Sequence, residues 1–230
     1  MRFKLQRQAS TPELNKLISK ELKRQEVLIP KASSKILKEI AEVCRTIEEK
    51  GLPDHLVCKK LPKSLGHGIF LHPKAKPIEK GSVIAPYSGK LSLESQNDPD
   101  DSDYAFAPLA EILLTKEEQA LFDPSRRHHP RRLYVLNLDA QKIGNFTRFI
   151  NHSDKPNIEA EFLQIPKNSY GLSPAPLEVI YMAKKRILPG EQLLISYEDG
   201  DEKSYWGVMG ITPYPLTPKT FRLSSSLKVI

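Results

Sequence analysis

The chain has 230 residues but only two cysteines, Cys44 and Cys58. Two cysteines cannot build a disulfide framework, and even with the nearby His55 they cannot supply the four ligands of a structural zinc site. We therefore expect no metal centre and two buried thiols in a reducing compartment.

Long apolar runs are also missing. No stretch approaches the roughly 20 apolar residues that span a bilayer, so we expect no membrane partner. The first residues, MRFKLQRQASTPELNK, carry charge but lack the apolar segment of a secretory signal. Phosphate-binding glycine loops, Ser-His-Asp sets and paired carboxylates are absent too, which argues against the common nucleotidases and hydrolases.

Residues 1–52 have the pattern of two amphipathic helices. The first is expected to begin at Thr11-Pro12, and the second to run from about Ser33 to Lys50 and end at Gly51. The apolar stripe of each helix is made of Leu14, Leu17, Ile18 and Leu22, and of Ile36, Ile40, Val43 and Ile47. We expect a helical hairpin that packs on the rest of the chain, with homodimer formation as the alternative.

From Leu56 onward, short runs of apolar residues alternate with Pro, Gly, Asn and Asp. Examples are HLVCKKL, GSVIAPY, RRLYVLNLD and EVIYMA. No β-α-β rhythm is present, and one helix is expected after Thr115. The pattern predicts a β-rich α+β domain.

One segment mixes polar and apolar side chains in an unusual way. In GNFTRFINHSDKPN, residues 144–157, Arg148, Asn151 and His152 stand among Phe146, Phe149 and Ile150. An unpaired buried amide costs about 1 to 3 kcal/mol, so these groups need each other or a ligand. The segment therefore predicts a functional site. A capped turn, in which Asn151 and Ser153 bond the local backbone, is the alternative.

Four segments in a fixed order resemble the SET-domain protein-lysine methyltransferases. They are SLGHGIF with PIEKGSVIAPYSGKL (64–91), DYAF (103–106), LNLDAQKIGNFTRFINHSDKPN (136–157) and YMAKKRILPGEQLLISYED (181–199). The resemblance implies a SET fold, with several small sheets around a knot-like C-terminal segment. It also implies transfer of a methyl group from S-adenosylmethionine to lysine by a catalytic domain over residues 53–206.

The chain departs from the eukaryotic SET pattern at its zinc-binding cysteines. The post-SET cysteines are absent, and Asp154 stands where many members have cysteine. Residues 207–230 are therefore expected to close the site as a tail, as in short zinc-free SET proteins of intracellular bacteria. That comparison predicts an intracellular protein, in the cytoplasm or, for a secreted bacterial effector, in the host nucleus.

The resemblance assigns roles to individual residues. Tyr197 corresponds to the catalytic tyrosine at the methyl-transfer axis, and Tyr87 to a tyrosine of the lysine channel. An ordinary strand tyrosine is the alternative for each. The implied cofactor-binding residues are Leu65, Gly66, His67, Gly68, Tyr104, Arg148, Asn151, His152 and Trp206. Trp206 would stack on adenine or simply pack on the core.

Two further positions bear on the number of methyl groups transferred. Ile195 and Ala160 stand where family members carry a Phe or Tyr that narrows the lysine channel. We therefore expect a roomy channel that permits di- or trimethylation.

Charge indicates partners. The formal net charge is +7, with twelve Lys/Arg against seven Asp/Glu in residues 1–50 and a basic loop, RRHHPRR, at Arg126–Arg132. These surfaces would contact nucleosomal or other nucleic-acid phosphates, or remain solvated. An acidic segment suited to a basic histone-like tail is formed by Glu94, Asp98, Asp100, Asp101 and Asp103.

The leading prediction is a protein-lysine methyltransferase acting on histone or histone-like proteins. The alternative is a catalytically silent SET-fold module that binds chromatin or a partner.

Overall fold

The computed structural model describes residues 11–62, 66–96, 104–166 and 169–197. The helices in these residues are α1 (Pro12–Arg24), α2 (Ser34–Lys50), α3 (Lys116–Phe122) and the 3-10 helix η1 (Phe146–Phe149). The strands are β1 (Leu56–Lys60), β2 (His67–Leu71), β3 (Val83–Pro86), β4 (Lys90–Ser95), β5 (Ala105–Leu113), β6 (Leu133–Asp139), β7 (Asn151–His152), β8 (Ile158–Ile165), β9 (Ala175–Ala183) and β10 (Leu194–Ile195). The predicted α+β class is confirmed.

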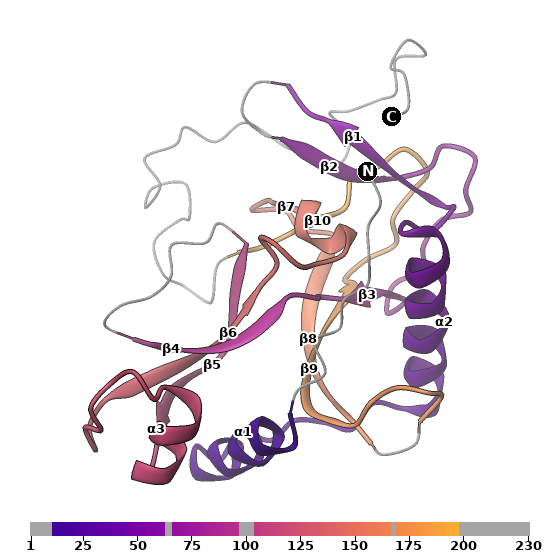
Figure 1. Ribbon diagram of the computed structural model, residues 1–230. Helices are drawn as coiled ribbons and strands as arrows, with labels where there is room; N and C mark the ends of the chain where they lie inside the picture. The colour runs from indigo at the N-terminus through magenta and orange to yellow at the C-terminus, as the bar shows by residue number, and fades with distance from the viewer. Residues whose placement is uncertain (1–10, 63–65, 97–103, 167–168, 198–230) are drawn as a thin grey trace.

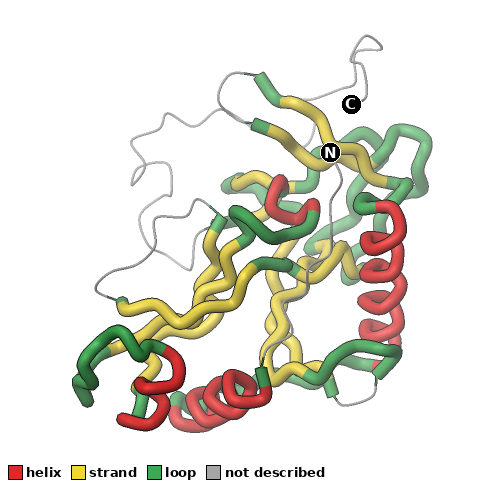
Figure 2. The backbone as a smooth tube through the Cα atoms, viewed as in Figure 1, coloured by secondary structure: helices red, strands yellow, loops and turns green. Residues whose placement is uncertain are grey.

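The strands form small separate sheets (Figure 1). β1 pairs with β2, and the two three-stranded antiparallel sheets have the orders β3-β9-β8 and β4-β6-β5. β7 and β10 form a short parallel pair although about 40 residues separate them in the sequence. Figures 1 and 2 show this pair and η1 between the β1–β2 hairpin and the three-stranded sheets.

Helix α2 begins and ends where the sequence predicts. The Ser33 side chain accepts a hydrogen bond from the Ile36 backbone N–H, and Gly51 ends the helix with a φ of 80°. Ile40 and Ile47 are 0% exposed, in two apolar clusters that include residues of β3, β8 and β9. The prediction that this stripe packs on the domain is confirmed.

Helix α1 lies across the edge of the β4-β6-β5 sheet. Leu17 and Ile18 are buried with Leu109 and Tyr134 of that sheet. The Glu21 carboxylate, 0% exposed, accepts a hydrogen bond from Arg24 Nε at 2.7 Å. Side chains of Lys20, Arg24 and Gln25 donate to backbone carbonyls of β5. These bonds satisfy carbonyl groups that an edge strand would otherwise leave open.

The predicted helical hairpin is wrong in one respect. α1 and α2 do not share an apolar cluster, because the α1 stripe packs on β5 and β6 whereas the α2 stripe packs on β3, β8 and β9. An amphipathic stripe requires an apolar partner but does not specify which one. Each helix therefore packs on a different sheet.

Two smaller expectations concern α3 and the cysteines. The helix expected after Thr115 is confirmed as α3, and Thr115 and Glu118 form a capping box at its start. Cys44 is buried, whereas Cys58 is only half-buried.

Of the helices that the structure describes, none has the length and apolar character needed to cross a membrane.

Candidate active site

The parallel pairing of β7 and β10 brings the two most distinctive sequence blocks together. Asn151 lies opposite Leu194, and His152 lies opposite Ile195. The Ser153 backbone N–H donates to the Ile195 carbonyl at 2.9 Å. The NHS segment therefore lies directly beside the segment that carries Tyr197.

Asn157 fixes this pairing from inside the core. Its side chain is 0% exposed, its Nδ2 donates to the Gln192 carbonyl at 2.8 Å, and its Oδ1 accepts from the Leu194 N–H at 2.8 Å. Its own backbone N–H donates to the Leu194 carbonyl at 3.0 Å. The sequence analysis included Asn157 only as the last residue of the segment 144–157 and missed this role.

Tyr197 is held at two points. Its backbone N–H donates to His152 Nδ1 at 2.9 Å, and its hydroxyl donates to the Ile150 carbonyl at 2.8 Å. The Tyr197 residue is 45% exposed, whereas His152 is 2% exposed. The buried imidazole therefore positions the tyrosine, and the hydroxyl has a fixed location instead of rotating in solvent.

Tyr87 belongs to a group of aromatic rings beside this site. Tyr87 stacks on Tyr181 with ring centroids 5.4 Å apart and lies 5.9 Å from the Phe106 ring. Phe106 in turn lies 6.1 Å from Phe162. The Tyr87 hydroxyl donates to the Tyr104 carbonyl at 2.7 Å. We call Tyr87, Phe106, Phe162 and Tyr181 the aromatic group.

Both buried phenols of the aromatic group are held neutral. Burial raises the pKa of Tyr87 above its ordinary value, and the negative charge of Asp139 adds to the effect. Burial likewise raises the pKa of Tyr181, with Tyr87 and Tyr197 as smaller causes. At physiological pH the rings of the aromatic group are therefore uncharged.

Sequence reasoning did not assign roles to Tyr181, Phe106 or Phe162. Tyr181 was detectable, because Val179, Tyr181 and Ala183 alternate along β9 with the residues that face α2. Tyr181 lies opposite Ala160 in the β8–β9 register, and Ile195 is buried in the same apolar cluster. A phenol thus stands next to position 160 although Ala160 itself has none.

The expected cofactor residues of β2 and β7 are in contact. Asn151 Nδ2 donates to the His67 carbonyl at 2.9 Å, and the His67 ring lies edge-on to Phe149 with centroids 5.6 Å apart. Gly66 has a φ of +66°, and a Cβ there would meet no atom within 4 Å. The backbone that leads into β2 therefore borders unoccupied space at Gly66, and a hydrogen bond joins it to Asn151 at His67.

Arg148 lies between two rings. Its guanidinium carbon is 5.2 Å from the Tyr104 ring centroid and 4.9 Å from that of Phe149. Its Nη1 donates to the Ala140 and Gln141 carbonyls at 2.8 and 3.0 Å. Its Nε is buried and has no hydrogen-bond acceptor in the part of the chain that is described.

Some residues named in the sequence analysis lie outside the described residues. They are Leu65, Trp206, Asp98, Asp100, Asp101, Asp103 and the tail, residues 207–230.

Gly68 is required for a different reason than the sequence indicated. A Cβ at this position would lie 2.6 Å from Gln192 Nε2 and 3.3 Å from Asn151 Nδ2. The residue therefore permits close packing on the fully buried Gln192 side chain. Whether its backbone also approaches a ligand remains a prediction.

Replacing Gly68 by Ala is expected to lower the free energy of unfolding by about 1 to 3 kcal/mol, because the added methyl overpacks the Gln192 amide. Denaturant unfolding measures this loss. Gly66→Asn is the matched control, since its side chain has space and Asn tolerates a left-handed backbone. Equal losses at the two glycines would show that packing on Gln192 is not the cause.

A sequence model of the SET domain matches residues 68–198, which is more than half of the chain. The chain belongs to the SET-domain family. The match runs from Gly68 in β2 through the β7–β10 pair to Tyr197, so it includes the region where these segments meet. The predicted family is confirmed, whereas α1 and α2 precede the matched SET domain.

Solved structures were also compared. The methyltransferase domain of human PR domain-containing protein 2 is 18% identical, with a TM-score of 0.39, over 77% of this chain and 94% of that one. KRYPTONITE in complex with mCHG DNA and SAH is 21% identical, with a TM-score of 0.42, over 71% of this chain and 27% of that one. KRYPTONITE with mCHH DNA, H3(1-15) peptide and SAH is 23% identical, with a TM-score of 0.41, over 69% and 26%. No curated protein sequence matches the chain.

Proposed function

We propose that this SET-domain chain is an S-adenosylmethionine-dependent protein-lysine N-methyltransferase that acts on basic proteins of the histone or histone-like kind. The observation that carries the proposal is the fixed position of the Tyr197 hydroxyl in the pairing of β7 and β10. His152 and Asn157 hold the backbone that presents it. The neutral aromatic group supplies the wall of a lysine channel.

The proposed cofactor-binding residues are Asn151, Arg148 and the backbone around His67. The buried Arg148 Nε lacks an acceptor among the described residues, and the backbone at Gly66 borders open space. A ligand with carboxylate and ring-nitrogen acceptors fits this combination. S-adenosylmethionine supplies the methyl group when it is bound.

The aromatic group prepares the substrate amine. A lysine loses its proton at pH 7 at a cost of about 4 kcal/mol, from three pKa units. Desolvation beside the aromatic group lowers this cost because burial disfavours the ammonium form. Both phenols are neutral at this pH, so neither supplies a negative charge that would stabilise the ammonium. The chain thus needs no strong general base.

A basic substrate is supported by the charge near Tyr87. Asp139, at the end of β6, is close enough to raise the pKa of Tyr87. A carboxylate beside the proposed channel favours the approach of a positively charged peptide.

Labelled methyl transfer tests the proposal. The full chain is incubated with methyl-labelled S-adenosylmethionine and either a histone mixture or a whole bacterial lysate. Label on a lysine ε-nitrogen, located by mass spectrometry, is the expected result. No label on either protein source, together with no calorimetric binding of S-adenosylhomocysteine, would support the catalytically silent module instead.

Ala160 provides a prediction about the product. The native chain is expected to form di- or trimethyllysine, because neither Ala160 nor Ile195 brings a phenol into the channel. Ala160→Tyr adds a phenol opposite Tyr181 and is expected to shift the product towards monomethyllysine. Mass spectrometry of the product, with Ala160→Val as control, measures this. A strictly monomethylated product of the native chain would contradict the roomy channel.

A further inference from the structure

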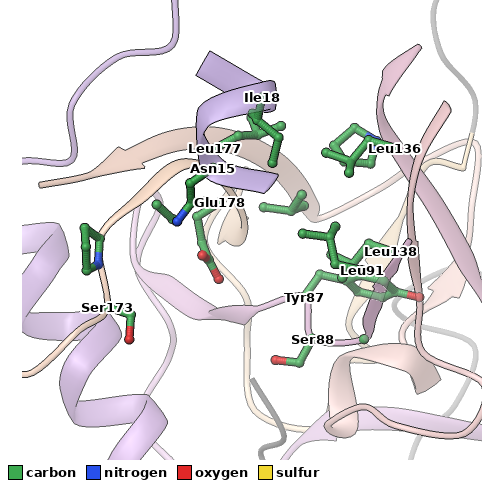
Figure 3. Close-up of a pocket in the computed structure, with 15 residues that line it drawn as sticks. Asn15, Ile18, Tyr87, Ser88, Leu91, Leu136, Leu138, Ser173, Leu177 and Glu178 are labelled. Atoms are coloured by element: carbon green, nitrogen blue, oxygen red, sulfur yellow. The ribbon is translucent and has the colours of Figure 1, made fainter. Parts of the chain in front are cut away.

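The cavity in Figure 3 lies between α1 and the sheets and has a volume of about 140 Å³. Leu91, Leu136 and Leu138 lie together on one side of it, and no lining residue is basic. Another part of the molecule holds a larger, open groove of about 640 Å³. The two hollows differ in charge, because lysine and histidine side chains line the groove.

The groove lies where three stretches of backbone meet, namely the residues before β1, the residues after β2 and the segment that leads into β3. Its polar lining residues are Asp54, His55, His72, Lys74, Lys76, Glu79 and Ser82. The candidate cofactor residues and the aromatic group are not among the lining residues. The groove therefore shares no residue with the candidate active site.

Backbone pairing places a second basic segment beside the groove. Ile78 and Ile187 exchange two hydrogen bonds of 3.0 and 2.9 Å, with the N–H of each donating to the carbonyl of the other. Residues 72–82 therefore lie beside residues 183–190, although the two segments are far apart in the sequence. Together they contain six Lys/Arg residues but only one Asp/Glu residue. The fold thus concentrates positive charge at this place.

The basic residues of the two segments are all exposed. They are Lys74, Lys76, Lys80, Lys184, Lys185 and Arg186. Both carboxylates of the groove lining are already in ion pairs, because Asp54 pairs with Lys50 and Glu79 accepts a hydrogen bond from Arg186 Nε at 3.1 Å. The groove and its edge therefore carry an excess of positive charge.

The two lysines of the groove lining are available to a ligand. Among the described residues, neither Lys74 nor Lys76 has a carboxylate partner. His72 Nδ1 accepts a hydrogen bond from the Lys74 backbone N–H at 3.1 Å, which leaves Nε2 to carry the proton of the neutral ring. The lining thus offers ammonium groups and an imidazole N–H as donors to an anion.

The form of this surface favours duplex DNA over other polyanions. Phosphate groups repeat along a duplex, so exposed cations in and beside a groove can contact several of them at once. No Phe, Tyr or Trp lines the groove, so it lacks the rings on which the bases of single strands stack. An acidic bilayer is flat on this scale and cannot enter a groove.

We propose that this groove and the basic segments beside it bind the phosphate backbone of duplex DNA without reading its sequence. Lys74 and Lys76 contact phosphates within the groove, and Lys184 and Lys185 contact them along its edge. The proposal does not depend on methyltransferase activity, because it concerns binding alone. It also differs from contact through the basic loop 126–132, which follows α3 and lies on the other side of the molecule from α2 and β3 in Figure 1.

Fluorescence anisotropy of the full chain with a short labelled DNA duplex tests the proposal. Titrations at several salt concentrations give the slope of log K against log[salt], which reports the number of phosphates contacted. Lys74→Gln combined with Lys76→Gln is expected to weaken binding about tenfold or more near 0.1 M salt and to reduce the slope by about 2. Lys184→Gln combined with Lys185→Gln is expected to weaken binding about threefold or more.

The control variant removes the same amount of charge elsewhere. Arg127→Gln combined with Arg131→Gln changes two exposed residues of the basic loop. It is expected to change the affinity for the duplex by no more than about twofold, because charges farther away than about 10 Å are screened at 0.1 M salt. A single-stranded RNA of the same length is expected to bind the native chain at least about threefold more weakly than the duplex.

Several results would overturn the proposal. They are the absence of saturable duplex binding by the native chain, equal losses in the groove and loop variants, and RNA binding as tight as duplex binding. Binding to phosphatidylserine vesicles without binding to the duplex would assign the surface to a membrane instead. If circular dichroism shows that the Lys74 and Lys76 variant does not fold, the Lys184 and Lys185 variant decides the question against the same control.

Discussion

Asn157→Leu is expected to lower the free energy of unfolding by about 3 to 5 kcal/mol. The substitution keeps a side chain branched at Cγ but removes the donor to the Gln192 carbonyl and the acceptor for the Leu194 N–H. Each buried backbone group left without a partner costs about 1 to 3 kcal/mol. Because β10 is only two residues long, few other bonds hold it against β7.

Denaturant unfolding of the native chain and the variant measures this loss. Asn157→Asp is the informative companion, because an aspartate keeps an acceptor for the Leu194 N–H but places a buried negative charge against the Gln192 carbonyl. Its loss is expected to be at least as large as that of Asn157→Leu. A loss under about 1 kcal/mol for Asn157→Leu would show that Asn157 does not hold the pair together.

Tyr197→Phe is expected to lower kcat by about 100-fold or more, because the hydroxyl fixed to the Ile150 carbonyl would no longer orient the reacting groups. The ring and the backbone bond to His152 remain, so the fold should persist. Binding of S-adenosylhomocysteine should change by no more than about twofold, because the hydroxyl is proposed to act on the transferred methyl and the amine.

Steady-state methyl transfer measures kcat, and calorimetry measures cofactor binding. Tyr170→Phe is the matched control, since Tyr170 is an exposed tyrosine remote in sequence from the β7–β10 pair. Unchanged kcat in Tyr197→Phe would remove Tyr197 from the chemistry. A parallel loss of kcat, cofactor binding and stability would assign Tyr197 a structural role only.

Helix ends were predictable because their causes are local. The Ser33 and Gly51 caps of α2 and the Thr115–Glu118 box of α3 each act within one turn of helix. The partner of each amphipathic stripe was not predictable. Whether α1 meets α2 or β5 depends on surfaces that are distant in sequence, which explains the error about the hairpin.

The candidate site was predictable in its parts but not in its assembly. Tyr197, Asn151 and His152 were identified by the blocks that carry them, yet the bonds among β7, β10 and Asn157 join residues about 35 to 45 apart. No local pattern encodes such a contact. Tyr181 differs, because strand alternation already places it on one face with Val179 and Ala183, and the structure shows that this is the face of Tyr87.

The most direct test of the central claim is methyl transfer from labelled S-adenosylmethionine by the native chain and Tyr197→Phe, side by side, on one histone mixture and one bacterial lysate. We expect label on a lysine of a basic protein with the native chain, and loss of that label with Tyr197→Phe. Equal labelling by both chains, or no labelling by a native chain that binds S-adenosylhomocysteine, would contradict the proposed mechanism.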